Sequence, residues 1–167
     1  MKTSHVLYGD DGVIVAEVGA ICVVIWRKDV VEHRFREQAT GLAQVVRNHR
    51  GGDAAFLCII ESTCRPPDDQ LRRASIDMVA AHDGDLSCVA CVVEGSGFRA
   101  AVGRSVLSGM SLIFSGRKAP VSVFASVPSA VDWMSERCRV SPALPATVER
   151  LRLLFESNAT QPSKALR

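Results

Sequence analysis

The chain has few aromatic residues and almost no excess of charge of either sign. Its 167 residues include one Tyr, two Trp and six Phe, and the formal net charge is +2 at pH 7. Proteins that bind nucleic acids use a concentrated basic surface, and single-strand binders add aromatic side chains on which bases stack. We therefore expect no nucleic-acid partner and no electrostatic attraction to an anionic membrane.

The sequence also lacks a long hydrophobic segment. No apolar run approaches the ~20 residues that cross a bilayer, and Met1–His5 does not read as the start of a signal peptide. We expect a cytoplasmic protein without membrane association. The cysteines agree with a reducing compartment, because most lie inside apolar runs, where a thiol behaves as a small core residue. These are Cys22, Cys58, Cys88 and Cys91.

A regular alternation of extended and helical segments is what the sequence does contain. Three apolar, β-branched runs, Ala54–Glu61, Leu86–Glu94 and Val121–Ser126, are each followed by a polar loop and a segment of helical period. This alternation predicts an α/β fold with one mixed sheet of four to five strands flanked by about four helices. Before it, His5–Tyr8 and Val13–Val18 read as extended segments.

Ala20–Arg27 is apolar at alternating positions on both faces, which is typical of a central strand. The helices are expected at about Phe35–His49, Asp69–Ala81, Ser96–Met110 and Ser126–Cys138. In the second of these, the buried face is predicted to be Leu71, Ala74, Met78 and Ala81.

The end of the chain departs from the alternation. Residues 1–140 are expected to form the α/β domain, and residues 141–167 a C-terminal amphipathic helix, Leu144–Phe155, with a disordered tail from Ser157. The helix would either fold back on its own domain or pair with a second copy in a homodimer. The pattern of apolar residues does not distinguish these two arrangements.

The order of elements from about Val13 to Cys138 resembles the STAS-like domain (sulfate transporter and anti-sigma-factor antagonist), especially its stand-alone branch. Ile21–Arg27 followed by Asp29–Glu32 is similar to the strand, turn and helix entry of that branch. Val123–Ser126 with Ala130 and Trp133 is similar to its final strand and Ala-x-x-Trp helix. The resemblance implies a regulatory module that binds a protein partner, with no catalysis and no cofactor.

The resemblance also implies a regulatory loop after the strand Ala54–Glu61. In the best-known branch, a Ser or Thr in this loop is phosphorylated and partner binding is switched off. Here the loop is Ser62–Asp69, in which Pro67-Asp68-Asp69 replaces the family's Asp-Ser. Ser62 and Thr63 lie near the phosphorylated position but do not match it. The candidate contact residues are Ser62, Thr63, Arg65, Asp68, Asp69, Arg72 and Arg73.

The same loop offers two chemical alternatives. Glu61, Asp68 and Asp69 could form an acid–base pair or hold a metal, but Asp68 and Asp69 are better explained as stabilising a helix N-terminus. Cys64 is expected to be an exposed thiol of lowered pKa, beside Arg65 and the same helix N-terminus. No histidine is expected at that side of the sheet, so an incidental surface cysteine is favoured over a nucleophile.

Gly95-Ser96-Gly97-Phe98-Arg99-Ala100 follows a strand, opens a helix and matches the G-x-G-x-x-A pattern of nucleotide sites. Such a site needs an acidic residue at the end of the next strand, and Ser115–Ser126 contains none. We expect a capped turn, with a small anion bound at Gly95, Ser96 and Gly97 as an alternative.

Cys88-x-x-Cys91 is an isolated CxxC, and residues three apart in a strand point to opposite faces of the sheet. We therefore expect core cysteines and no metal site. Besides the interaction module, one further function stays open, which is the binding or sensing of a small ligand such as a lipid or a nucleotide. An enzyme is not expected, because no nucleophile lies beside a base.

Overall fold

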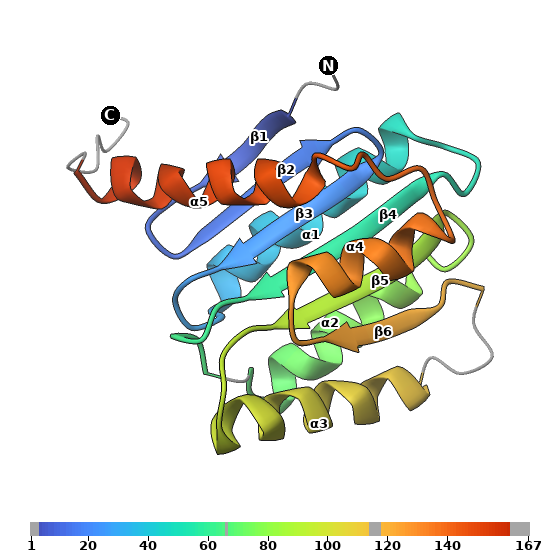
Figure 1. The fold of residues 1–167 in the computed structure, drawn as a ribbon. Helices are drawn as coiled ribbons and strands as arrows, with labels where there is room; N and C mark the ends of the chain where they lie inside the picture. The colour runs from blue at the N-terminus through green and yellow to red at the C-terminus, as the bar shows by residue number, and fades with distance from the viewer. Residues whose placement is uncertain (1–3, 66, 114–117, 161–167) are drawn as a thin grey trace.

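A single six-stranded sheet forms the centre of the molecule (Figure 1). The computed structural model describes residues 4–65, 67–113 and 118–160. The strands are β1 (Ser4–Gly9), β2 (Val13–Val18), β3 (Ile21–Trp26), β4 (Ala54–Ile60), β5 (Leu86–Val93) and β6 (Val121–Phe124), and they lie side by side in chain order. The first three are antiparallel and β3 to β6 are parallel, so the predicted mixed α/β sheet is confirmed.

The predicted count of four to five strands was wrong, because six strands pair. β1 is the additional edge strand, and it pairs with β2 from Ser4 to Gly9. Its extended conformation was predicted for His5–Tyr8, but it was not counted in the sheet, and four of its six residues are exposed. β3 is central as predicted, with every residue buried and neighbours on both sides.

Five helices in the described part of the chain cover the two faces of the sheet (Figure 1). They are α1 (Glu32–Asn48), α2 (Asp69–Ala80), α3 (Phe98–Ile113), α4 (Val127–Ser135) and α5 (Leu144–Thr160). α1 and α2 lie on one face, α4 and α5 lie on the other, and α3 lies beside β6 at the sheet margin. None of the described helices is long and apolar enough to cross a bilayer.

Two hydrophobic cores result, because side chains alternate between the faces of each strand. Ile14, Val23 and Leu57 face α4 and α5. Val15, Val24 and Phe56 face α1 and α2. The strands are apolar on both sides, which explains why they read as continuous hydrophobic runs in the sequence.

The ends of the helices depend on local capping. α2 begins where the Asp68 carboxylate accepts a hydrogen bond from Leu71 N at 2.8 Å. α4 begins at Ser126, whose hydroxyl caps Ser129 N, with Pro128 in its first turn. α1 begins three residues before the predicted Phe35, after the extended residue Val31.

The predicted buried face of α2 was only partly right. Leu71 is buried, but Ala74 and Met78 are half-buried and Ala81 is exposed. Val79 is buried instead, so the helix is turned slightly from the predicted orientation.

α5 folds back on its own domain and crosses the strands at the β1 side of the sheet (Figure 1). Leu144, Val148, Leu151 and Phe155 are all buried in the core shared with α4, so this apolar face is not available to a second copy. The helix runs on to Thr160, beyond the predicted end at Phe155, and Ser157 to Thr160 are helical rather than disordered. The rest of the expected tail, residues 161–167, lies outside the described residues.

Candidate functional site

Two edges of the sheet carry the candidate residues. We define the carboxyl edge as the side where β3 to β6 end and the amino edge as the side where they begin. The loop Ser62–Asp69 follows β4, and the loop Gly95–Gly97 follows β5, so both lie at the carboxyl edge. The two loops are in close contact, because a Cβ built on Gly95 would lie 2.9 Å from the Ser62 Cβ.

The loop Ser62–Asp69 is held to the end of β3 by its own polar groups. The Thr63 hydroxyl donates to Arg27 O at 2.5 Å, and Arg65 N donates to Asp29 Oδ1 at 2.8 Å. The Arg65 side chain is 78% exposed, and Ser62 is also exposed. The backbone of this loop is therefore fixed, while Ser62 and Arg65 face solvent; Pro66 lies outside the described residues.

Cys64 contradicts the prediction of an exposed, acidified thiol. Its side chain is buried, and its Sγ donates to Trp26 O at 3.1 Å and to Lys28 O at 3.2 Å. Burial raises the pKa of Cys64 to about 12, and the nearby carboxylates Asp29 and Glu61 act in the same direction. The thiol therefore stays protonated at neutral pH, despite its position near a helix N-terminus.

The charged residues at the start of α2 have the structural roles that capping predicts. Asp68 caps Leu71 N, and Asp69 forms an ion pair with Arg72 one turn along the helix. Arg73 is exposed on the outer side of α2. Three arginines are candidate contact residues: Arg65 in the loop, and Arg72 and Arg73 on α2. Of these, Arg65 and Arg73 are the most exposed.

The loop Gly95–Gly97 is exposed and its glycines are required by the backbone. Gly95 has φ +105° and Gly97 has φ +84°, both in the left-handed region. Ser96 lies between them at the surface, and Arg104 Nη1 donates to Gly95 O at 3.4 Å. Anion binding at this loop stays a prediction, since a turn before a helix accounts for the same geometry.

Glu61, the third carboxylate considered with Asp68 and Asp69, is occupied by arginines. Arg27 Nε lies 2.8 Å from one of its oxygens, and Arg152 Nη1 lies 3.3 Å from the other. Arg152 also forms two hydrogen bonds to Glu94, at 2.9 and 2.6 Å, and these bonds raise the pKa of Arg152 although burial opposes its charge. This network ties α5 to the ends of β4 and β5.

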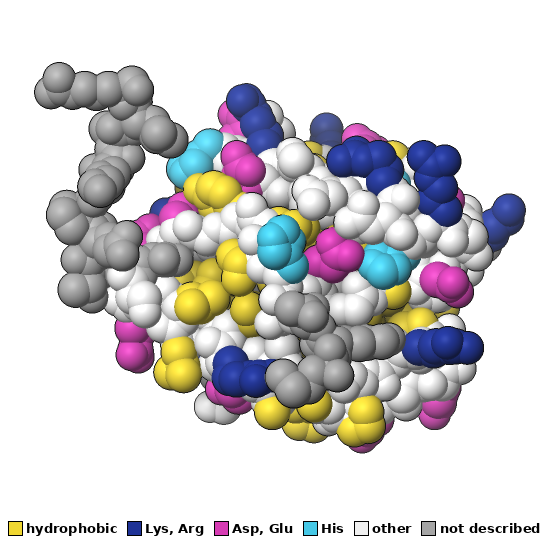
Figure 2. Space-filling model, turned by 90° about the horizontal axis from the view of Figure 1, so that it is seen from above, with side chains coloured by type: hydrophobic (Ala, Val, Ile, Leu, Met, Phe, Trp, Pro, Cys, Tyr) yellow, Lys and Arg dark blue, Asp and Glu magenta, His cyan; other side chains and the backbone are white. Residues whose placement is uncertain are grey.

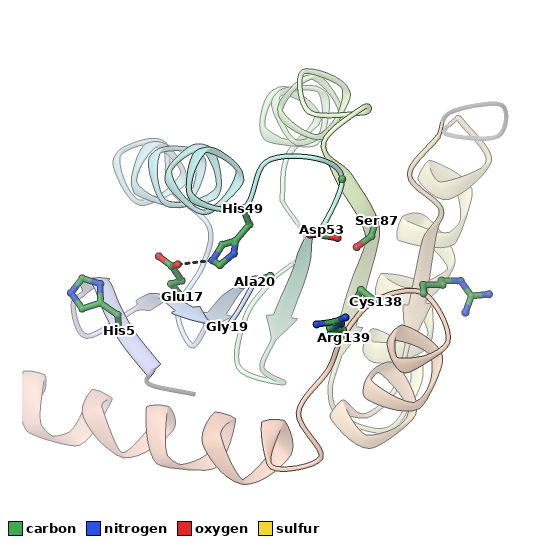
Figure 3. A pocket seen from close by; sticks show the side chains of 11 residues that line it. His5, Glu17, Gly19, Ala20, His49, Asp53, Ser87, Cys138 and Arg139 are labelled. Atoms are coloured by element: carbon green, nitrogen blue, oxygen red, sulfur yellow. Dashed lines mark hydrogen bonds and ion pairs between the residues drawn. The ribbon is translucent and has the colours of Figure 1, made fainter. Parts of the chain in front are cut away.

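An open cleft of about 810 Å³ lies at the amino edge (Figure 3). Its lining comes from segments far apart in the sequence: β1, β2, the β2–β3 turn, the end of α1, the starts of β4 and β5, and the residues after α4. The side chains with polar or reactive groups are His5, Glu17, His49, Asp53, Ser87, Arg137, Cys138 and Arg139. Cations and carboxylates thus face the same space.

One wall of the cleft is a hydrogen-bonded histidine–glutamate pair. His49 Nε2 lies 2.9 Å from Glu17 Oε1, and Asn48 Nδ2 donates to the other Glu17 oxygen at 3.0 Å. Figure 3 shows this pair on one side, with Asp53, Ser87, Cys138 and Arg139 on the other. In the view of Figure 2, histidine side chains lie beside acidic ones near the middle of the face, and Lys and Arg stand apart around its rim.

Sequence reasoning missed this cleft. The histidines were considered only as partners of Cys64, from which they were expected to be distant, whereas His49 caps α1 and meets Glu17, 32 residues earlier. The only local signal was Gly51-Gly52, which ends α1 and lets the chain enter β4 with φ of +99° and +84°. Glu17 could be placed at the amino edge, beside His49, only once the pairing of β2 with β3 was known.

Cys88 and Cys91 lie on opposite faces of β5, as predicted, since they belong to different cores. Within residues 4–65, 67–113 and 118–160, no cluster of three or more His, Cys, Asp or Glu side chains has the geometry of a metal site.

Comparison with known proteins gives no significant match to a family model, to a curated protein or to a solved structure. Functional assignment therefore depends on the fold and on the two edges described above.

Proposed function

We propose that the chain is a STAS-like regulatory domain of the cytoplasm, which acts without catalysis by binding a protein partner at the carboxyl edge. The order of elements supports the STAS-like assignment, with an antiparallel strand pair leading into parallel strands joined by helices. The six cysteines, all within the described residues, are not disulfide-bonded, which suits a reducing cytoplasm.

The observation that carries the proposed contact surface is the junction of two exposed loops. Ser62 meets Gly95 there, and Arg65 and Arg73 project from the adjoining backbone. Asp29 and Asp68 hold the loop backbone and the helix start in place, so little ordering would be needed on binding. Exposed arginines on a fixed backbone suit a partner that presents carboxylates.

Charge reversal tests this surface. Lysate of the source organism is passed over the immobilised parent protein, the double variant Arg65→Glu/Arg73→Glu, and Arg47→Glu, an exposed arginine on α1 that serves as the control. We expect one protein to be retained by the parent and by Arg47→Glu, and to be lost from the double variant at least tenfold. Equal retention by all three would reject the carboxyl edge as the contact surface.

The cleft at the amino edge favours a second function, the binding of a small ligand. Its volume of about 810 Å³ is that of a typical small-molecule site, and charged groups converge on it. Native mass spectrometry of the freshly purified protein, with thermal shift against nucleotides and fatty acids, tests this function. Ala20→Trp, which fills the cleft from the β2–β3 turn, should abolish any shift; a bare protein mass with no shift would exclude this class of function.

A further inference from the structure

Two cysteines that are distant in the sequence touch at the wall of the cleft. Cys88 on β5 and Cys138, three residues after the end of α4, are 50 positions apart, and their Sγ atoms are 3.9 Å apart. Cys88 is fully buried, whereas Cys138 is half-buried and lines the cleft. A disulfide needs ~2.05 Å between the sulfur atoms, so the two sulfurs must move closer together to bond.

We propose that Cys88 and Cys138 are a peroxide-responsive thiol pair that closes to an intramolecular disulfide. The Cys138 thiolate attacks hydrogen peroxide, the O–O bond breaks, and Cys138 becomes a sulfenic acid while hydroxide leaves. The Cys88 sulfur then attacks the Cys138 sulfur and displaces the second hydroxide, which takes up the Cys88 proton as water. Both thiols are oxidised together by two electrons, and one peroxide is reduced to two waters.

The surroundings assign the two roles. Cys138 is half-buried and lines the cleft, whereas Cys88 is fully buried, so peroxide in the cleft reaches Cys138 first. The hydrogen bond to Cys138 and burial both raise the pKa of Cys88, so Cys88 keeps its proton at neutral pH. Cys138 therefore reacts first and Cys88 resolves the sulfenic acid.

The remaining thiols provide an internal contrast. Cys58 and Cys91 are directly opposite each other on the parallel strands β4 and β5. Burial raises the pKa of Cys91 to about 11 and that of Cys58 well above its ordinary value. Neither lines the amino-edge cleft; both line a separate, largely apolar cavity between the sheet and α1 and α2.

The disulfide would affect the cleft directly. It would join the start of strand β5 to the segment that carries Arg137 and Arg139, and so fix one wall of the cleft. The inference does not depend on the proposed protein partner, because the pair lies at the opposite edge from Arg65.

The experiment exposes the full chain to hydrogen peroxide, blocks the remaining thiols with an alkylating agent in denaturant, and maps the peptides by mass spectrometry. We expect a Cys88–Cys138 disulfide that leaves four of the six cysteines alkylated, and full recovery of six after reduction. Cys91→Ala, on the same strand but the opposite face, should form the same disulfide. Cys138→Ser should keep all five of its cysteines alkylated.

Three results would overturn the proposal: six alkylated cysteines in the treated parent, a disulfide between any other pair, or equal thiol loss in Cys138→Ser. Peptide mapping of the parent decides the first two without any variant. The third result requires the Cys138→Ser variant to fold. This substitution changes a half-buried residue outside the helices and strands, where it is expected to be tolerated.

Discussion

The two edges of this sheet use charge in opposite ways. At the carboxyl edge, Glu61 and Glu94 are bridged by Arg152, and Asp10 is bound by Arg34. At the amino edge, the His49–Glu17 pair stands at the wall of an open cleft. Ligands of open α/β sheets ordinarily bind at the carboxyl ends of the strands. Here the contacts of α5 fill the carboxyl edge, and the cleft that could hold a ligand lies at the amino edge.

α5 accounts for this difference. After α4 the chain returns across the sheet as α5. Arg152 contacts Glu61 and Glu94 after β4 and β5, and Phe155 contacts Arg27 after β3. The Arg27 guanidinium lies 4.3 Å from the centre of the Phe155 ring and also binds Glu61. Cation, ring and carboxylates thus form one connected group, and the comparison predicts that the stability of the fold is concentrated there.

The largest expected effect comes from breaking this group. Arg152→Met keeps an unbranched apolar stem but removes the guanidinium, which leaves Glu61 and Glu94 without their shared cation. The Arg152 side chain is only 17% exposed, so we expect a loss of about 3 kcal/mol in the free energy of unfolding, measured with urea. Arg150→Met, two residues earlier and exposed, should cost less than about 0.5 kcal/mol. Equal losses of stability in the two variants would show that the Arg152 contacts at the carboxyl edge are not a main source of stability.

The sequence was sufficient for the elements at both edges but not for their chemistry. β-Branched runs and capping residues such as Asp68 act locally, which is why the strands and the starts of α2 and α4 were predictable. Cys64 was misjudged because a loop position suggested exposure, whereas two carbonyls of the β3 end draw its thiol inward. The cleft and the Arg152 network join residues 32 to 91 positions apart, and no local pattern records such pairings.

A smaller, pH-dependent effect is expected from Asp10 at the carboxyl edge. Burial raises its pKa, but the hydrogen bonds from Arg34 and from Gly12 N and Val13 N outweigh burial, and the net pKa lies below the ordinary value. A carboxylate with a lowered folded pKa stabilises the fold fully above its unfolded pKa of ~3.9. That contribution is lost as the pH falls through the folded pKa.

Asp10→Asn should therefore lower the free energy of unfolding by about 1–2 kcal/mol at pH 7, and the difference from the parent should shrink below about pH 4. Urea titrations between pH 3 and pH 7 would measure it. Asp11→Asn is the matched control, because Asp11 also binds Arg34 but is 43% exposed, and its effect should be smaller at every pH. A parent–variant difference for Asp10→Asn that is the same at pH 3 and pH 7 would contradict this electrostatic account.

The smallest effect on stability is expected at the amino edge, and it is the sharpest test of the contrast. Glu17→Gln keeps the shape of the side chain and an oxygen that can accept from Asn48, but removes the charge opposite His49. Because the two side chains are 18% and 30% exposed, water replaces much of the lost attraction, and we expect less than about 1 kcal/mol. Urea unfolding beside Arg152→Met measures both edges under the same conditions. Equal losses in Glu17→Gln and Arg152→Met would mean that the cleft wall stabilises the fold as much as the contacts of α5 do. A ligand that displaced Glu17 from His49 would then destabilise the whole protein.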